Sequence, residues 1–431
     1  MNKHMTRPAL LALAAALSCG AHAQSSIQPP KVQLWMDVST GGMAGMPEMP
    51  AAAAGMGGLF GGGARGAGNA NTTYGAARGM TVMPPRVLDI ALLNTRNPGK
   101  EAQQLIPAGM RMGDSLPLVP PKAEPRTERE PGDYSQEMPR DKPKGRVLVY
   151  WGCGAEVRKG QPRVIDLARG NPADYASAFS GRYVPDRGAR VSPQYALYPN
   201  EKNRVQLSRD SSLQGEHRIQ GEAIPDSMRF TLGGAQDLMP AIDLQARGDL
   251  KASVPLQWAS VAHARAYYLH AMGQVGDDLV LWSSAETGDT GMGLFDYLPN
   301  ATIDRWVKES VLLKPEATSC AVPRGIFANA QGAMVRMMAY GGESNFAHPP
   351  RPADPKAPWA PEWAVRVRVK ASTMALLGED TSARGGSSGG SYGGGNEQAA
   401  QPATPVNPVQ GAVDAVIPGA AGAVLKGLFG R

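Results

Sequence analysis

The chain has 431 residues and a formal net charge of +6 at pH 7, from 44 Lys and Arg against 38 Asp and Glu. Because this excess is small and no block of five or six like charges occurs, the composition argues against a nucleic-acid-binding protein. Glycine (52) and proline (37) are abundant and gather in a few segments, which predicts disordered tails and linkers around two or three packed domains.

The first 23 residues have the pattern of a secretory signal peptide. Lys3 and Arg7 precede a short apolar run, and Ala21-His22-Ala23 forms a small-x-small cleavage site. The run is too short to span a bilayer. Cleavage after Ala23 removes Lys3 and Arg7 and lowers the net charge from +6 to +4. The sequence therefore predicts a secreted, periplasmic protein.

The three cysteines are interpreted in the light of that compartment. Cys19 lies in the signal peptide, and the residues before it, Ala16-Leu17-Ser18, resemble a lipoprotein motif only poorly. Cleavage leaves Cys153 and Cys320, and a lone pair in an oxidising compartment predicts a disulfide. Two free thiols or a metal-binding pair are the alternatives, but two cysteines without nearby histidine make a poor metal site.

Residues 24–80 are expected to hold one strand and then a low-complexity segment. Residues 31–38 alternate like a half-buried strand, with one shared face formed by Val32, Leu34, Met36 and Val38. The segment Gly41–Ala70 is rich in Gly, Ala and Met and sustains no helical or strand period, which predicts disorder.

Three methionines in that segment are regularly spaced, Met43, Met46 and Met49. Soft thioether ligands suit Cu(I), so a copper site is one interpretation of this spacing. The other is that methionine is simply a frequent residue in a biased segment, since no His or Cys accompanies the three.

Residues 81–239 are expected to form an irregular β domain. Strands are predicted at 86–93 and 146–151, with further short strand-like runs at 204–207, 217–220, 228–232 and 241–245. The segment 107–145 is rich in proline, which cannot donate to a β-ladder, and is therefore predicted to be a long surface loop. A short helix is expected at Asn171–Asp174.

Residues 240–377 show the clearest strand pattern. Val254, Leu256 and Trp258 alternate with polar residues or proline, and a short turn leads to a second alternating run at 266–271 and a third strand at 278–282. The segment Leu256-x-Trp258, turn, Ala266-Tyr267-x-Leu269 resembles the second and third strands of fibronectin type III and related immunoglobulin-like modules. The resemblance covers about 254–284. It implies a β-sandwich with Trp258 and Tyr267 in the core, and it is silent on function.

The rest of this domain is compatible with a sandwich. Strands are predicted at 322–327, 334–340 and 363–370, with a short helix at 302–313. In the last strand Trp363, Val365, Val367 and Val369 are expected to face inward. Arg366, Arg368 and Lys370 are then expected to face outward as a basic stripe for an anionic glycan or lipid head group. A solvated sheet face is the alternative.

The C-terminal part changes composition twice. Residues 378–408 are rich in Gly, Ser and Pro and are predicted to be a flexible linker. Residues 409–431 are apolar, with a small residue at every fourth position. This pattern predicts a short helix that contacts a second helix or a membrane surface.

The sequence contains no Gly-x-Ser-x-Gly, His-Glu-x-x-His or phosphate-binding loop motif, so it assigns no catalytic residue and no cofactor. We therefore predict a mainly β protein, an irregular β domain followed by an immunoglobulin- or fibronectin-III-like β-sandwich. Its predicted role is a non-enzymatic binding or structural protein of the cell envelope, with an envelope protein or glycan as partner. A copper-handling protein and a glycan-active or hydrolytic enzyme are the alternative functions.

Overall fold

The structure, a computed structural model, describes residues 28–46, 74–79, 85–122, 145–167, 181–183, 188–354 and 356–378. The predicted signal peptide, most of the low-complexity segment, the helix expected at Asn171–Asp174, the linker after residue 378 and the C-terminal tail lie outside the described residues.

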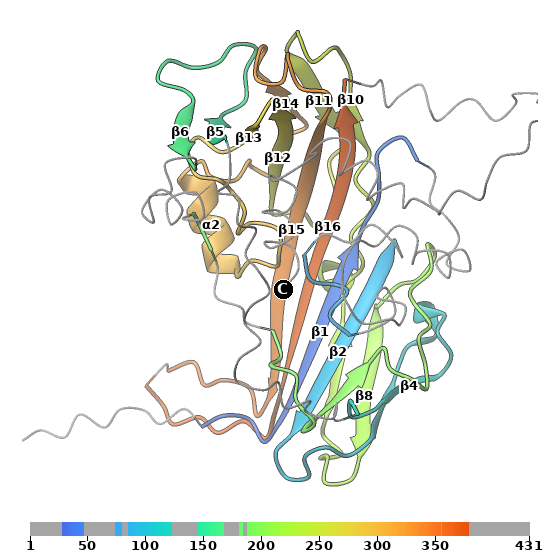
Figure 1. Cartoon of the computed structure of the whole chain (residues 1–431). Helices are drawn as coiled ribbons and strands as arrows, with labels where there is room; N and C mark the ends of the chain where they lie inside the picture. The colour runs from blue at the N-terminus through green and yellow to red at the C-terminus, as the bar shows by residue number, and fades with distance from the viewer. Residues whose placement is uncertain are drawn as a thin grey trace, which may run out of the picture.

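The described part of the chain is mainly β, as predicted, and its largest element is a nine-stranded sheet (Figure 1). In spatial order the strands are β6 (Arg163–Asp166), β5 (Arg146–Trp151), β13 (Asp278–Ser283), β12 (Ala266–Val275), β15 (Ala333–His348), β16 (Trp363–Leu377), β1 (Val32–Thr40), β2 (Arg86–Asn94) and β7 (Tyr195–Tyr198). Neighbours are antiparallel except β1 with β16 and β5 with β13, which are parallel.

Two smaller sheets and short helical segments complete the described fold. The four-stranded sheet has the order β4 (Ser115–Leu118), β3 (Ala102–Leu105), β8 (Gly215–Gly221) and β9 (Arg229–Leu232). The three-stranded sheet has the order β10 (Leu244–Ala246), β11 (Val254–Trp258) and β14 (Ser319–Val322). The helical segments are α2 (Asn300–Lys308), η3 (Ala108–Met110) and η4 (Gly234–Gln236).

The main core lies between one face of the large sheet and the two small sheets. The alternation in β1 and β16 directs the predicted apolar side chains into it, including Leu34, Met36, Val365 and Val367. These residues pack in one cluster with residues of both smaller sheets, such as Leu256. The prediction of which side chains of β1 and β16 face inward is therefore confirmed.

The opposite face of the large sheet is also covered. Ile303 and Trp306 of α2 pack there with Tyr268, Met338 and Tyr340, which project from β12 and β15. In Figure 1, α2 lies to the left of β15 and β16. Because both faces are covered, polar residues that alternate with the apolar ones also become buried, which strand alternation alone does not predict.

The expected boundary at residue 240 does not separate two sheets. The nine-stranded sheet takes β1, β2, β5, β6 and β7 from before that boundary and β12, β13, β15 and β16 from after it. The link is the pairing of β1 with β16, in which Leu34 lies opposite Val365 and Val38 opposite Val369. The sequence pattern of each strand gives no information on this long-range partner.

Some local predictions need correction. The proline-rich segment 107–145 is not all loop, because its first part contains η3 and β4, with Pro117 paired to Gln103. β4 is an edge strand of its sheet, so one side of the strand needs no hydrogen-bond donor and proline is tolerated. Residues 204–207 do not form a strand, and the strand predicted at 322–327 is absent, since β14 covers Ser319–Val322 and residues 323–327 form no strand.

Trp258 and Tyr267 lie on strands of two different sheets and meet between them. Trp258 belongs to β11 and Tyr267 to β12, and their ring centroids are 5.6 Å apart in an edge-on arrangement. The backbone N–H of Val261, in the turn between the strands, donates to the Tyr267 hydroxyl at 3.0 Å. This hydrogen bond satisfies a buried polar group and fixes the turn that connects the sheets.

Candidate functional site

The predicted basic stripe on β16 does not face solvent. Arg368 is 4% exposed and Lys370 1% exposed, and the Arg366 side chain is half-buried beside Glu343. The prediction of an outward, ligand-facing stripe is therefore wrong for two of its three members, Arg368 and Lys370. The physical reason is position, since β16 is an interior strand whose second face is covered by residues 74–79 and 295–297.

Arg368 forms a buried ion pair with Asp37 of the neighbouring β1. The guanidinium donates from Nε and Nη2 to the two carboxylate oxygens at 2.7 and 2.5 Å. The Tyr297 ring stacks on the same guanidinium, 4.5 Å from its carbon. Burial acts to lower the pKa of Arg368, but the Asp37 carboxylate outweighs it and holds this pKa above its ordinary value. Both carboxylate oxygens of Asp37 thus accept a hydrogen bond from the Arg368 guanidinium.

Lys370, two residues along the same face, holds the covering segments. Its ammonium donates to the carbonyl oxygens of Gly79 and Phe295, lies 3.7 Å from the Asp296 carboxylate and sits over the Tyr297 ring. Burial lowers the pKa of Lys370 to about 8, although Asp296 acts in the opposite direction. A lysine with a depressed pKa can act as a nucleophile, but the side chain of Lys370 is 0% exposed and has no open approach.

Asp89 on β2 ties down the other end of the covering segment. Its Oδ2 accepts hydrogen bonds from the backbone N–H groups of Gly75 and Ala77 at 3.0 and 2.8 Å. Its Oδ1 is buried without a hydrogen-bond partner. Burial, and then the nearby Asp37, raise the pKa of Asp89 to about 7, against the lowering effect of the two backbone donors.

These residues form what we call the charge clamp: Asp37, Asp89, Arg368, Lys370, Asp296 and Tyr297. Perturbed pKa values often mark catalytic sites, but structural ion-pair networks perturb them as well. In the clamp the hydrogen bonds and close charge contacts given above run to other members or to backbone of residues 75–79 and 295. This arrangement fastens two loops to the sheet, and among its charged members Asp37, Arg368 and Lys370 are buried.

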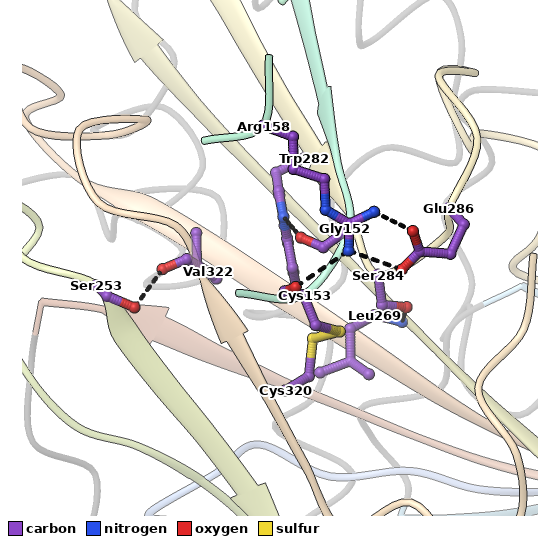
Figure 2. Close-up of a disulfide and its surroundings, with 10 residues drawn as sticks. All are labelled: Gly152, Cys153, Arg158, Ser253, Leu269, Trp282, Ser284, Glu286, Cys320 and Val322. Carbon is purple, nitrogen blue, oxygen red and sulfur yellow. Dashed lines mark hydrogen bonds and ion pairs between the residues drawn. A yellow bond between two sulfur atoms is a disulfide. The ribbon is translucent and has the colours of Figure 1, made fainter. Parts of the chain in front are cut away.

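Cys153 and Cys320 form a disulfide, as predicted, with their Cα atoms 5.2 Å apart and 167 positions apart in sequence (Figure 2). Cys153 follows β5 of the nine-stranded sheet, and Cys320 lies in β14 of the three-stranded sheet. The bond therefore joins two sheets across the main core. On the chain-entropy model a crosslink of this span stabilises by about 5 kcal/mol.

Neighbouring contacts hold the turn that carries Cys153. The indole N–H of Trp282 donates to the Gly152 carbonyl at 3.0 Å, and Gly154 N–H donates to the Ala321 carbonyl at 3.0 Å. Figure 2 shows Arg158 reaching across the turn to the Glu286 carboxylate. The Gly-Cys-Gly sequence is thus a tight turn that presents a disulfide cysteine, with Gly152 at a φ of +89°.

The methionine spacing and the histidines give no complete metal site by themselves. Met43 pairs with Met374 of β16, Met46 is 49% exposed, and Met49 lies outside the described residues. His270 is buried, with Nε2 beside the Thr290 carbonyl at 3.0 Å and Nδ1 without a partner. Within the described ranges, no group of three or more His, Cys, Asp and Glu side chains is arranged to hold a metal ion.

The connection between β15 and β16, residues 349–362, carries a partly exposed tryptophan on a loop rich in proline. It contains six prolines and projects beyond the end of the sheet at the lower left of Figure 1. Trp359 is half-buried in it, its indole N–H donates to the Pro349 carbonyl at 3.0 Å, and the guanidinium of exposed Arg351 lies 5.6 Å from its ring centroid. Sequence analysis missed this feature, although a tryptophan among prolines and charges was a signal.

No family model, no curated protein and no solved structure matches this chain. In the part of the chain that the structure describes, no helix has the length and apolar character needed to cross a membrane.

Proposed function

We propose that this protein is a secreted, periplasmic, non-enzymatic protein of the cell envelope that binds a partner through the loop between β15 and β16. The observation that carries the proposal is the contrast between two groups of residues. The interior charges of Arg368 and Lys370 are paired within the clamp, whereas half-buried Trp359 and exposed Arg351 lie on a proline-rich loop.

The disulfide supports the compartment. A crosslink between Cys153 and Cys320 forms and persists in oxidising surroundings and is rare in reducing ones. The sequence of the first 23 residues, with cleavage after Ala23, is consistent with export.

The strand arrangement supports an immunoglobulin- or fibronectin-III-like unit over residues 244–377. In such sandwiches the first, second and fifth strands share one sheet, and the third, sixth and seventh share the other. Here β10, β11 and β14 form one sheet, and β13, β12, β15 and β16 are consecutive in the other. The strands that carry Trp258 and Tyr267 correspond to the second and third strands of the module, as the sequence resemblance implies.

That correspondence makes the loop 349–362 the connection between the last two strands of the module. Loops at the ends of these sandwiches are frequent binding surfaces, since a rigid sheet positions them. The loop is anchored, because Trp359 accepts a backbone hydrogen bond from Gln28 and Glu362 donates one to His348. A pre-ordered loop lowers the entropy cost of binding.

Binding to envelope components tests the proposal. We would incubate the full mature chain with purified cell-wall glycan and, separately, with solubilised envelope proteins, and compare it with Trp359→Ala. Loss of an anchoring tryptophan costs about 2 kcal/mol, so we expect affinity to fall roughly thirtyfold.

Arg209→Ala is the matched control, because Arg209 is exposed on a different loop. It should bind as the unmodified chain does. Binding that is unaffected by Trp359→Ala, or absent for both preparations, would show that this loop is not a binding surface. Retention of the unprocessed chain in the cytoplasm with reduced cysteines would contradict the assigned compartment.

A further inference from the structure

Methionines gather on the outer face of the large sheet, on the side opposite the main core. Met272 of β12, Met334 of β15 and Met374 of β16 belong to one packed cluster, and Met43 and Met292 pack against it. Met43 follows β1 along the chain and Met292 precedes α2, so five segments contribute methionines to this cluster.

Strand register places these methionine residues next to one another in a continuous series. Met272 lies directly opposite Met334, and Met43 directly opposite Met374. Met334 faces Leu376, which lies two residues after Met374 on the same strand face, so Met334 and Met374 are diagonal neighbours. Direct partners have Cβ atoms about 5 Å apart and diagonal ones roughly 7 Å, both within reach of flexible methionine side chains.

The series opens to solvent at one end. Met272 is 1% exposed, Met334 and Met374 are each 8% exposed, Met43 is half-buried, and Met46 is 49% exposed. Met46 is held next to Met43 by a turn, because its backbone N–H donates to the Met43 carbonyl at 3.2 Å. Met43 itself is fixed to β16, because the following residue, Ala44, donates its N–H to the Met374 carbonyl at 2.8 Å.

Charge distinguishes the two ends of the series. The Arg336 guanidinium lies 3.6 Å from the Met272 sulfur, over the Phe295 ring, and its positive charge disfavours a cation at this inner end. The outer end, at Met43 and Met46, is next to solvent. A metal would therefore enter and bind at the outer end.

We propose that Met43, Met46 and Met374 form a thioether site for a soft monovalent metal ion, Cu(I). Three neutral sulfur donors without a carboxylate or imidazole suit Cu(I) and do not suit Zn²⁺, Ca²⁺ or Mg²⁺. The site differs from the methionine spacing seen in the sequence, because its third ligand comes from β16, some 330 residues away, instead of from Met49. It is independent of the binding role proposed for the loop at 349–362.

The test is anaerobic titration of the full mature chain with Cu(I), in competition with a chromogenic Cu(I) chelator, and with Zn²⁺ in a parallel titration. We expect one Cu(I) per chain and no Zn²⁺. Met374→Leu keeps the apolar volume and removes the sulfur, and it should weaken Cu(I) binding at least about tenfold. Met43→Leu should do the same.

Met337→Leu is the matched control, because Met337 is buried on β15 but faces the main core, and it should leave Cu(I) binding unchanged. Circular dichroism of each variant shows whether the fold is kept. Failure of the unmodified chain to compete for Cu(I) would overturn the proposal. It would also be overturned if Met49→Leu abolished binding while Met374→Leu did not, since the ligands would then lie in the low-complexity segment alone.

Discussion

Replacing Arg368 by methionine should strongly destabilise the protein. The Arg368 and Asp37 side chains are 5% and 2% exposed, and two hydrogen bonds of 2.7 and 2.5 Å join them. Arg368→Met keeps the apolar length of the side chain but leaves the Asp37 carboxylate buried without its cation. Removing one partner of such a pair costs about 3–5 kcal/mol, because the desolvation of the remaining charge is no longer compensated.

The assay is urea unfolding of the disulfide-bonded chain, followed by tryptophan fluorescence, with Arg368→Met, Asp37→Leu and the double variant. Each single change should lower the unfolding free energy by about 3–5 kcal/mol with an unchanged urea dependence. The double variant should lose much less than the sum, because both buried charges are gone. A loss below about 1 kcal/mol for either single variant, or strictly additive losses, would refute the buried pair.

Two further results are expected. The pKa of Asp89 is raised to about 7, above its ordinary value, so its contribution to stability is fully present below pH 4 and is lost as the pH rises through 7. In urea unfolding, Asp89→Asn should reduce the difference in unfolding free energy between pH 4 and pH 8 by up to about 4 kcal/mol. An identical pH dependence in both proteins would contradict the assignment. The Cys153→Ala, Cys320→Ala double variant should lose about 5 kcal/mol and become insensitive to reductant, and equal stability of the oxidised and reduced unmodified chain would show that the bridge contributes nothing.

Much of the β structure could be predicted because strand alternation is a local property. The strands at 31–38, 86–93, 146–151 and 363–370 appear as β1, β2, β5 and the first half of β16. The compartment argument also predicted the disulfide between Cys153 and Cys320, since two cysteines allow only one intramolecular pairing.

The charge clamp could not be predicted, because burial of a sheet face depends on elements far away in sequence. Alternation correctly separates Arg368 and Lys370 from Val367 and Val369, but it cannot show whether the second face is covered. One signal was available: Asp37 and Asp89 each lie between two apolar residues in a strand. An acidic residue in such a place needs a cation or backbone donors, and both were found.

The order of the strands within the large sheet could not be predicted from the sequence either. No local pattern indicates that β1 pairs in parallel with β16, or that Met43 meets Met374. The same limitation affected the division at residue 240, because a local strand pattern does not show which sheet a strand joins.

The pairing of β1 with β16 has a consequence for the order of folding. Asp37 and Arg368 are 331 positions apart, so the largest sheet joins the first and last described strands of the chain. A nascent chain that ends before residue 363 lacks β16, the strand that lies between β15 and β1. It also lacks Arg368, the cation that pairs with Asp37. Contacts of such high sequence separation slow folding, since the loop-closure entropy is lost before they form. The sheet can therefore close only once β16 is present, and until then β1 and β15 each keep an unpaired edge, which is prone to aggregation.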